Sequence, residues 1–133
     1  MIVVDTNIIS YLFIKGDQTE AVKKVLQEDP EWISSILWRS EFRSVLSLYL
    51  RKKYLNLSQV KFLMEGAEYL LLGAEYQVNS NKILDLLINT NLSAYDCEFV
   101  ALAKELSVNL ITTDKRILDE VPEVALSIGQ FLA

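Results

Sequence analysis

The sequence predicts an α/β fold in which helices cover both faces of a mainly parallel sheet. Short apolar runs typical of buried strands alternate with amphipathic segments typical of helices. Strands separated by helices pair in parallel through right-handed crossovers. The 133 residues are 51% hydrophobic with only 4 Gly and 2 Pro, a composition typical of a compact domain with a substantial core. We therefore expect residues 1–133 to form a single domain.

The first third of the chain predicts a strand, two helices and a second strand. The apolar opening run, residues 1–4, suits a buried strand that ends at Asp5. The spacing of apolar residues predicts helices over residues 6–14 and 21–27. The next strand is expected over residues 32–36.

The middle of the chain predicts a pair of helices and a short strand. Residues 40–54 and 58–71 place their apolar side chains at helical spacing, and Ser58 is the expected N-cap of the second helix. A short strand is expected over residues 75–78, within a stretch that is apolar but weakly patterned.

The last part predicts two more helices and the remaining strands. Asn79 or Ser80 is expected to cap a helix that runs to about Ile88. Ser93 and Asp96 match a capping box, which opens a helix that ends near residue 107. Three further elements are expected: a strand at 110–112, a short helix at 115–118 and a strand at 124–128.

Missing residue types exclude whole mechanisms. The chain has no His and a single Cys, Cys97. Ser-His-Asp and Cys-His catalysis, His-rich zinc sites and Cys-based zinc clusters all need residues that are missing. Cys97 cannot form an intramolecular disulfide and is expected to be a small buried side chain.

The hydrophobic pattern also argues against membrane insertion. No apolar run reaches the roughly 18 residues that span a bilayer. Asp5 and Asn7 interrupt the N-terminal apolar stretch too early for a signal peptide. A soluble, cytoplasmic protein is therefore expected.

Four carboxylates are expected to meet at one edge of the sheet. Asp5 and Asp114 directly follow strand-like runs, whereas Glu41 and Asp96 lie in first turns of helices. Ligands of open parallel sheets bind outside the carboxyl ends of the strands. Glu98 does not belong to this set, because two residues after Asp96 its side chain can face away from the site on the same helix. Each acid alone also has a structural interpretation, since carboxylates favour helix N-termini.

A divalent cation would relieve the repulsion among these acids. Mg2+ prefers oxygen ligands, keeps several waters, and is usually held by one or two carboxylates together with substrate phosphates. Asn7 and Thr112 would add neutral oxygens at the same edge. Such a site suits hydrolysis of a phosphodiester bond without histidine.

The basic residues are clustered, although the protein is acidic overall. The chain has 18 Asp and Glu against 13 Lys and Arg, and the net charge of -5 argues against nucleic-acid binding. A solvated surface is one interpretation of the basic clusters. Two pairs close in sequence to the candidate acids are the expected contacts to an RNA backbone: Arg39 and Arg43, and Lys115 and Arg116.

Four stretches in series, spanning nearly the whole chain, carry a resemblance to a known family. They are Val3-Val4-Asp5-Thr6-Asn7, Ser40-Glu41-Phe42, Ser93-Ala94-Tyr95-Asp96 with Val100-Ala101-Leu102-Ala103, and Leu110-Ile111-Thr112-Thr113-Asp114-Lys115-Arg116. Together they resemble a PIN domain, and more closely the VapC-type toxins of prokaryotic toxin-antitoxin systems.

The resemblance implies a single PIN-like domain with a three-layer α/β/α fold and a central, mainly parallel sheet. It also implies a Mg2+- or Mn2+-dependent endoribonuclease that is usually a homodimer. A cognate antitoxin is expected to inhibit the enzyme by placing a peptide in the active-site groove.

The resemblance also implies a role for individual residues. Asp5, Glu41, Asp96 and Asp114 match the catalytic acids of the family. Asn7 matches the polar position two residues after the first acid, and Thr112 the hydroxyl two residues before the last. The family pattern implies that Asp5 and Asp96 bind the metal most directly, with Asp114 as the third metal-binding acid.

Three alternative functions are open at this point. A PIN-like fold can be a catalytically inactive module that binds RNA or protein. A haloacid-dehalogenase-like phosphatase also has an Asp after its first strand, but it has a second acid where Asn7 stands. A response-regulator receiver would need paired acids there and a Lys after a late strand, and neither is present. Stabilisation by Mg2+ or Mn2+ would separate a metal enzyme from an inactive module.

Aromatic residues are concentrated toward the N-terminal end of the chain, and most are expected in the core. The excess, together with a mean hydropathy of +0.22, predicts a partner surface: a dimer interface and a groove for an antitoxin helix. These residues are Tyr11, Phe13, Trp38, Phe42, Tyr49 and Tyr54.

Overall fold

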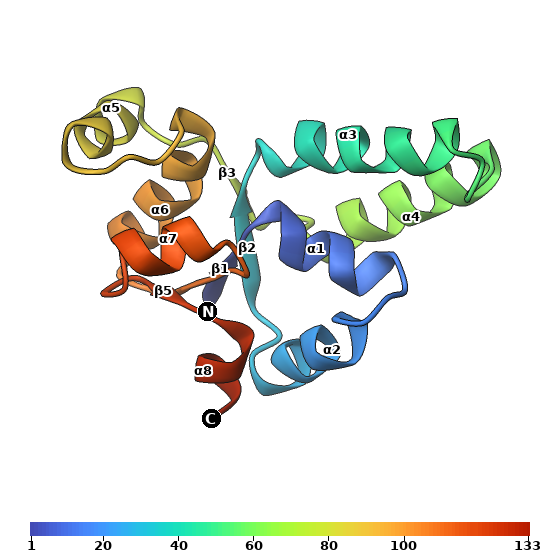
Figure 1. Ribbon diagram of the computed structural model, residues 1–133, viewed down its shortest axis with the longest axis horizontal. Coiled ribbons are helices and arrows are strands. Elements are labelled where there is room, and N and C mark those ends of the chain that lie inside the picture. The colour runs from blue at the N-terminus through green and yellow to red at the C-terminus, as the bar shows by residue number, and fades with distance from the viewer.

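The computed structural model describes all 133 residues and has three layers, with a five-stranded sheet between two layers of helices (Figure 1). All four strand pairings are parallel, and the strand order is β3-β2-β1-β4-β5. The predicted three-layer α/β/α architecture is confirmed. The strands are β1 (Ile2–Val4), β2 (Trp32–Ser35), β3 (Glu75–Tyr76), β4 (Leu110–Ile111) and β5 (Ala125–Leu126).

Eight helices connect and cover these strands. They are α1 (Thr6–Phe13), α2 (Thr19–Glu28), α3 (Trp38–Arg51), α4 (Leu57–Leu70), α5 (Ser80–Asn89), α6 (Ala94–Leu106), α7 (Lys115–Glu120) and α8 (Ile128–Leu132). Helices α1 to α4 lie on one side of the sheet, α5 to α7 lie on the other, and α8 packs against α2 (Figure 1). The longest helices have 14 residues, and none combines the length and apolar character needed to cross a bilayer.

The order of the strands creates a switch point between β1 and β4. The chain builds β2 and β3 on one side of β1 and then returns to add β4 and β5 on its other side. Crossovers therefore leave the neighbouring carboxyl ends of β1 and β4 in opposite directions, which opens a crevice at that edge. Asp5 follows β1 directly, and Thr112 follows β4.

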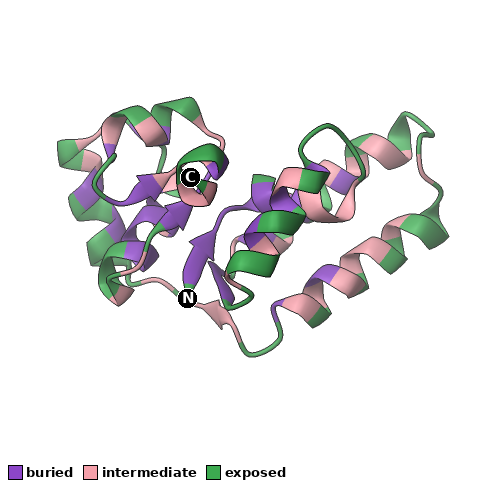
Figure 2. Cartoon of the chain, turned by 90° about the horizontal axis from the view of Figure 1, so that it is seen from below, coloured by how far each residue is buried: buried purple, intermediate pink, exposed green.

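The sheet forms the centre of the hydrophobic core. Strands β1, β2 and β4 are buried throughout and β3 at the edge is half-buried, whereas the outer faces of the helices are exposed (Figure 2). Trp38 and Phe42 of α3 are fully buried, with ring centroids 6.2 Å apart. Cys97 is also fully buried, as expected. Tyr54 is 70% exposed, so the aromatic residues do not all belong to the core.

The start of α4 differs from the prediction. Its N-cap is Asn56 and not Ser58, because Asn56 and Gln59 form a complete capping box. At the start of α6, by contrast, only half of the expected box is present: the Ser93 hydroxyl accepts a hydrogen bond from the Asp96 amide. The side chain of Asp96 is left free to face elsewhere.

The C-terminal prediction is wrong in one respect. A strand was expected over residues 124–128, but β5 contains only two residues. Ser127 and Gln130 form a capping box that starts helix α8, which was not predicted. The capping residue Ser127 therefore ends the strand earlier than the apolar character of residues 124–128 predicts.

Candidate functional site

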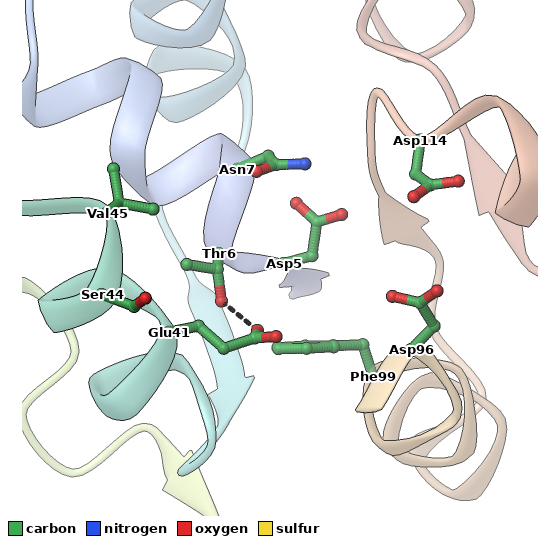
Figure 3. Close-up of a pocket in the computed structure, with 9 residues that line it drawn as sticks. All are labelled: Asp5, Thr6, Asn7, Glu41, Ser44, Val45, Asp96, Phe99 and Asp114. Carbon is green, nitrogen blue, oxygen red and sulfur yellow. Dashed lines mark hydrogen bonds between the residues drawn. The ribbon is translucent and has the colours of Figure 1, made fainter. Parts of the chain in front are cut away.

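A polar cavity of about 260 Å3 opens at the carboxyl end of β1, at the switch point of the sheet. Residues from α1, α3, α6 and the turn before α7 surround it (Figure 3). Its nine lining residues are Asp5, Thr6, Asn7, Glu41, Ser44, Val45, Asp96, Phe99 and Asp114.

Asp5 is the most deeply buried acid of the pocket, only 5% exposed. It is the N-cap of α1, and one carboxylate oxygen accepts a hydrogen bond from the Ile8 amide at 3.2 Å. The Thr112 hydroxyl donates to the other oxygen. The pKa of Asp5 is raised to about 6, chiefly by burial; the charges of Asp114 and Asp96 contribute to this rise, and the hydrogen bonds from Thr112 and Ile8 partly oppose it.

Thr112 connects the first and last acids of the chain. Its side chain is fully buried, and its oxygen accepts a hydrogen bond from the Asp114 amide at 3.0 Å. Asp114 is itself the N-cap of α7 and accepts from the Ile117 amide at 3.1 Å. One hydroxyl thus fixes both the orientation of Asp5 and the turn that carries Asp114.

Glu41 enters the pocket from the opposite side, on the first turn of α3 (Figure 3). The Thr6 hydroxyl donates to its carboxylate at 2.7 Å. Burial raises the pKa of Glu41, and the charges of Asp96 and Glu98 add to this effect, while the Thr6 hydrogen bond lowers it. The carboxylate therefore holds a proton more readily than a solvent-exposed glutamate.

Asp96 points into the pocket from the first turn of α6, and Phe99 lies one turn further along the same helix (Figure 3). Burial and the charge of Asp114 raise the pKa of Asp96, whereas Ser93 and Arg116 lower it. The Phe99 side chain, only 2% exposed, extends between Asp96 and Glu41 and supplies an apolar wall to an otherwise polar cavity.

The carboxylates surround the cavity but do not form a complete set of metal ligands. No three acids of the structure lie close enough together to make a ready-made coordination shell. The pKa values of Asp5, Glu41 and Asp96 are nevertheless all raised by neighbouring negative charge as well as by burial. Every cation-binding side chain that lines the cavity offers oxygen, which is the donor preferred by Mg2+ and Mn2+.

The sequence matches the PIN domain family over residues 2–124. This chain belongs to the PIN domain family. Proteins with this domain are generally nucleases. A search of curated proteins finds no match to the sequence.

Solved structures share the fold of this PIN domain. FitAcB from Neisseria gonorrhoeae is 20% identical with a TM-score of 0.77, and the match covers 97% of this chain and 99% of that one. FitAB bound to an IR36 DNA fragment is also 20% identical, with a TM-score of 0.73 and coverages of 96% and 95%. A toxin-antitoxin complex from Klebsiella pneumoniae has a TM-score of 0.66 at 20% identity, with coverages of 96% and 98%.

The candidate basic residues lie in different environments around this PIN domain. Arg116 is exposed and close enough to Asp96 to lower its pKa. Lys115 is exposed and pairs with Asp119 on its own helix at 3.2 Å. The exposed Arg43 folds back onto the first turn of α3, where its guanidinium donates to the Arg39 carbonyl at 3.1 Å.

Arg39 does not line the pocket. Its partly exposed guanidinium is already paired with Glu75 and Glu68, which does not favour the predicted contact to RNA. Asn7, two residues after Asp5, is exposed and lines the cavity, as expected for the polar residue of the site (Figure 3).

Four lining residues were not predicted: Thr6, Ser44, Val45 and Phe99. Helical spacing could have found three of them. Ser44 and Val45 follow Glu41 by three and four residues, and Phe99 follows Asp96 by three, so they share a helix face with an acid. The contact of Thr6 with Glu41 has no such local signal.

Glu98 does not line the pocket, but its charge acts on Glu41. Its carboxylate accepts a hydrogen bond from the Ser35 hydroxyl at 2.6 Å. The Ser35 oxygen in turn accepts from the Leu37 amide at 3.2 Å. Glu98 therefore connects α6 to the turn between β2 and α3.

Proposed function

We propose that this PIN domain is a Mg2+- or Mn2+-dependent endoribonuclease and the toxin of a toxin-antitoxin pair. One observation carries the proposal. Carboxylates from four separate parts of the chain, Asp5, Glu41, Asp96 and Asp114, line one polar cavity at the switch point of a parallel sheet. A fold of this family with this acidic cavity and no histidine suits phosphodiester hydrolysis assisted by a cation.

The residues present fit such a cation. Asp5, Asp96 and Asp114 are the acids that would hold it, one or two of them directly, because Mg2+ is usually held by one or two carboxylates together with waters and substrate phosphates. Asn7 can add a neutral oxygen. A bound divalent cation supplies positive charge at the phosphate being cleaved and acidifies a water molecule. It would also neutralise the repulsion that raises the pKa values of Asp5 and Asp96.

The protein itself orients the reacting groups. Thr112 holds the Asp5 carboxylate in one orientation, which keeps it ready to bind a cation. Thr6 does the same for Glu41. Since its pKa is raised, Glu41 is the acid we assign to take up the proton released by the attacking water.

The substrate backbone would follow the exposed basic residues. Arg116 lies near Asp96, so it can meet a phosphate next to the cleaved one. Lys115 and Arg43 are exposed as well and can contribute longer-range attraction. Their positive charge offsets the net charge of -5 at the place where RNA would approach.

The decisive experiment is cleavage of a mixed pool of structured RNA by purified protein with Mn2+ or Mg2+. We expect cleavage that EDTA abolishes and that Asp5→Asn abolishes, while Asp85→Asn, which changes an exposed acid of α5, cleaves like the wild type. Cleavage that survives Asp5→Asn would contradict the assigned site. No cleavage by folded protein free of any inhibitor would favour an inactive RNA- or protein-binding module.

An apolar groove supports the antitoxin partner. A cavity of about 600 Å3 lies among α1, α3 and α4, and seven of its ten lining residues are hydrophobic, including Phe13, Tyr54 and Phe62. A third cavity, of about 400 Å3, shares Tyr49 with this groove and Asn7 with the acidic pocket. A partner could therefore lay an apolar helix in the groove and continue toward the acids.

An antitoxin is the proposed partner because the structural neighbours include a toxin-antitoxin complex and FitAB bound to DNA. Substitutions in the groove test whether the antitoxin binds there. We expect Phe62→Ser, at a side chain that is 74% exposed, to weaken binding of the cognate antitoxin and leave RNA cleavage unchanged. Wild-type affinity in this variant would place the antitoxin elsewhere.

A homodimer is the proposed assembly. Several large apolar side chains are exposed, and Ile88 of α5, at 86%, is the most exposed of them. A second copy of the chain could cover such side chains where they lie next to one another. Sedimentation of the purified protein should give twice the 15.2 kDa mass of one chain. A monomer at all concentrations would contradict this proposal.

A further inference from the structure

A partly buried ionic cluster holds the first turn of α3 on the side away from the acidic pocket. The guanidinium of Arg39 donates to both carboxylate oxygens of Glu75 on β3, from Nε at 2.6 Å and from Nη2 at 2.8 Å. Its Nη1 donates to Glu68 of α4 at 2.5 Å. One side chain therefore ties the start of α3 to an edge strand and to a neighbouring helix.

Trp38 strengthens the same cluster. Its indole N–H donates to Glu75 at 2.7 Å, and the Arg39 guanidinium lies 5.9 Å from the centre of its ring. Trp38 is fully buried, and the side chains of Glu75 and Arg39 are 15% and 33% exposed, so the pair is partly shielded from solvent. Solvent screens such a pair less than it screens an ion pair on the surface, and the guanidinium lowers the pKa of Glu75.

The start of α3 has no side-chain cap. Its N-cap position is Leu37, which cannot accept a hydrogen bond through its side chain. Arg39 and Glu41 are two positions apart, so they point about 200° apart around the helix. The ionic cluster therefore holds one side of the first turn while Glu41 enters the acidic pocket from the other.

We infer that Arg39 is a positioning residue for Glu41. Through its pair with Glu75 it fixes the first turn of α3 and, with it, the distance of the Glu41 carboxylate from the acids on α1 and α6. This inference rests on the proposed function, in which Glu41 accepts a proton. Arg39→Met should still fold, because Trp38 and Phe42 remain buried and Ser35 still anchors the preceding turn to Glu98.

The experiment compares Arg39→Met, Arg39→Lys and a matched ion-pair control, Lys82→Met. Lys82 pairs with Glu105 between α5 and α6 at 3.0 Å, away from the acidic pocket. We expect Arg39→Met to lower kcat about 10- to 100-fold with KM unchanged, since a small displacement of a reacting group has this effect. Arg39→Lys should recover part of kcat, because lysine keeps the charge but not the two-pronged geometry. Lys82→Met should behave like the wild type.

Hydrogen exchange separates positioning from general destabilisation. Faster exchange in Arg39→Met should be confined to residues 38–44. Wild-type kcat in that variant, or faster exchange throughout the chain, would overturn the inference. If the wild-type protein cleaves no RNA, the proposed function is wrong. If the wild type cleaves RNA and Arg39→Met cleaves it equally well, only the inference about Arg39 is wrong.

Discussion

The Thr112 hydroxyl at the end of β4 donates a hydrogen bond to the Asp5 carboxylate at the end of β1, 107 positions earlier in the sequence. The same oxygen accepts from the Asp114 amide. This contact joins the two strands that flank the switch point of the sheet. It also makes the orientation of Asp5 depend on the turn that carries Asp114.

The titration of Asp5 should be visible in the stability of the metal-free protein. Its pKa rises from 3.8 to about 6 on folding, so the folded state binds more protons between these pH values. Its contribution to stability is therefore fully present below pH 3.8 and is lost as the pH rises through about 6. At about 1.4 kcal/mol for each pKa unit, the loss approaches about 3 kcal/mol.

Urea unfolding of the wild type and Asp5→Asn, in EDTA, measures this loss. Asparagine also caps helices, so the start of α1 should survive the substitution. The variant should gain stability relative to the wild type between pH 4 and 7. A difference that does not change with pH would show that burial of Asp5 has been overstated.

Thr6→Val should shift the pH dependence of cleavage upward. The substitution removes the hydroxyl that donates to Glu41, and this hydrogen bond lowers the pKa of the carboxylate. We expect the acidic limb of kcat/KM to move by about one pH unit, the typical size of a hydrogen bond to a charged group. Thr6→Ser keeps the donor and should retain the wild-type profile. Identical profiles for the Val and Ser variants would exclude this role for Thr6.

Mn2+ should stabilise the folded protein, because a ligand of the native state raises the free energy of unfolding. At a concentration of 100 times Kd the increase is about 2.7 kcal/mol. Asp96→Asn should abolish both this increase and RNA cleavage, with little loss of stability in EDTA, since it relieves repulsion by Asp114. Thermal unfolding with and without Mn2+ gives the answer. A strongly destabilised Asp96→Asn protein would indicate a structural role for this acid.

Arg116→Ala should weaken RNA binding and leave the fold intact. The side chain is exposed, and its loss removes one phosphate contact. Measured in a cleavage-deficient Asp5→Asn background, the slope of log K against log salt concentration should fall by about one. Lys23→Ala, which changes an exposed residue of α2, provides the control. An unchanged slope would mean that RNA avoids the start of α7.

The fold and the four acids could be predicted because their signals are local. Each strand is a short apolar run, and Asp5 and Asp114 follow such runs directly. The helix dipole and capping place acids at helix starts, so Glu41 and Asp96 were also visible. The capping interpretation is correct for Asp5 and Asp114, which cap helices and line the pocket at the same time.

The remaining features depend on contacts between distant parts of the chain. Thr6 and Glu41 are 35 positions apart, and Arg39 is 29 and 36 positions from its two acidic partners. No periodicity in the sequence indicates such pairs. The charge of Arg39 alone predicts a contact with RNA, whereas in the structure its guanidinium pairs with Glu75 and Glu68. Helix α8 differs from the prediction because the apolar run before it is typical of a strand, whereas the cap at Ser127 starts a helix.

The junction of β1 with β4 also bears on how the protein is made. Asp5 is synthesised 107 residues before Thr112, and Asp114 follows two residues after Thr112. Pairing between strands so far apart in sequence forms late, because the long intervening segment must first be ordered. A nascent chain therefore carries an incomplete set of acids until Asp114 has left the ribosome, and the acidic pocket cannot be complete before that point.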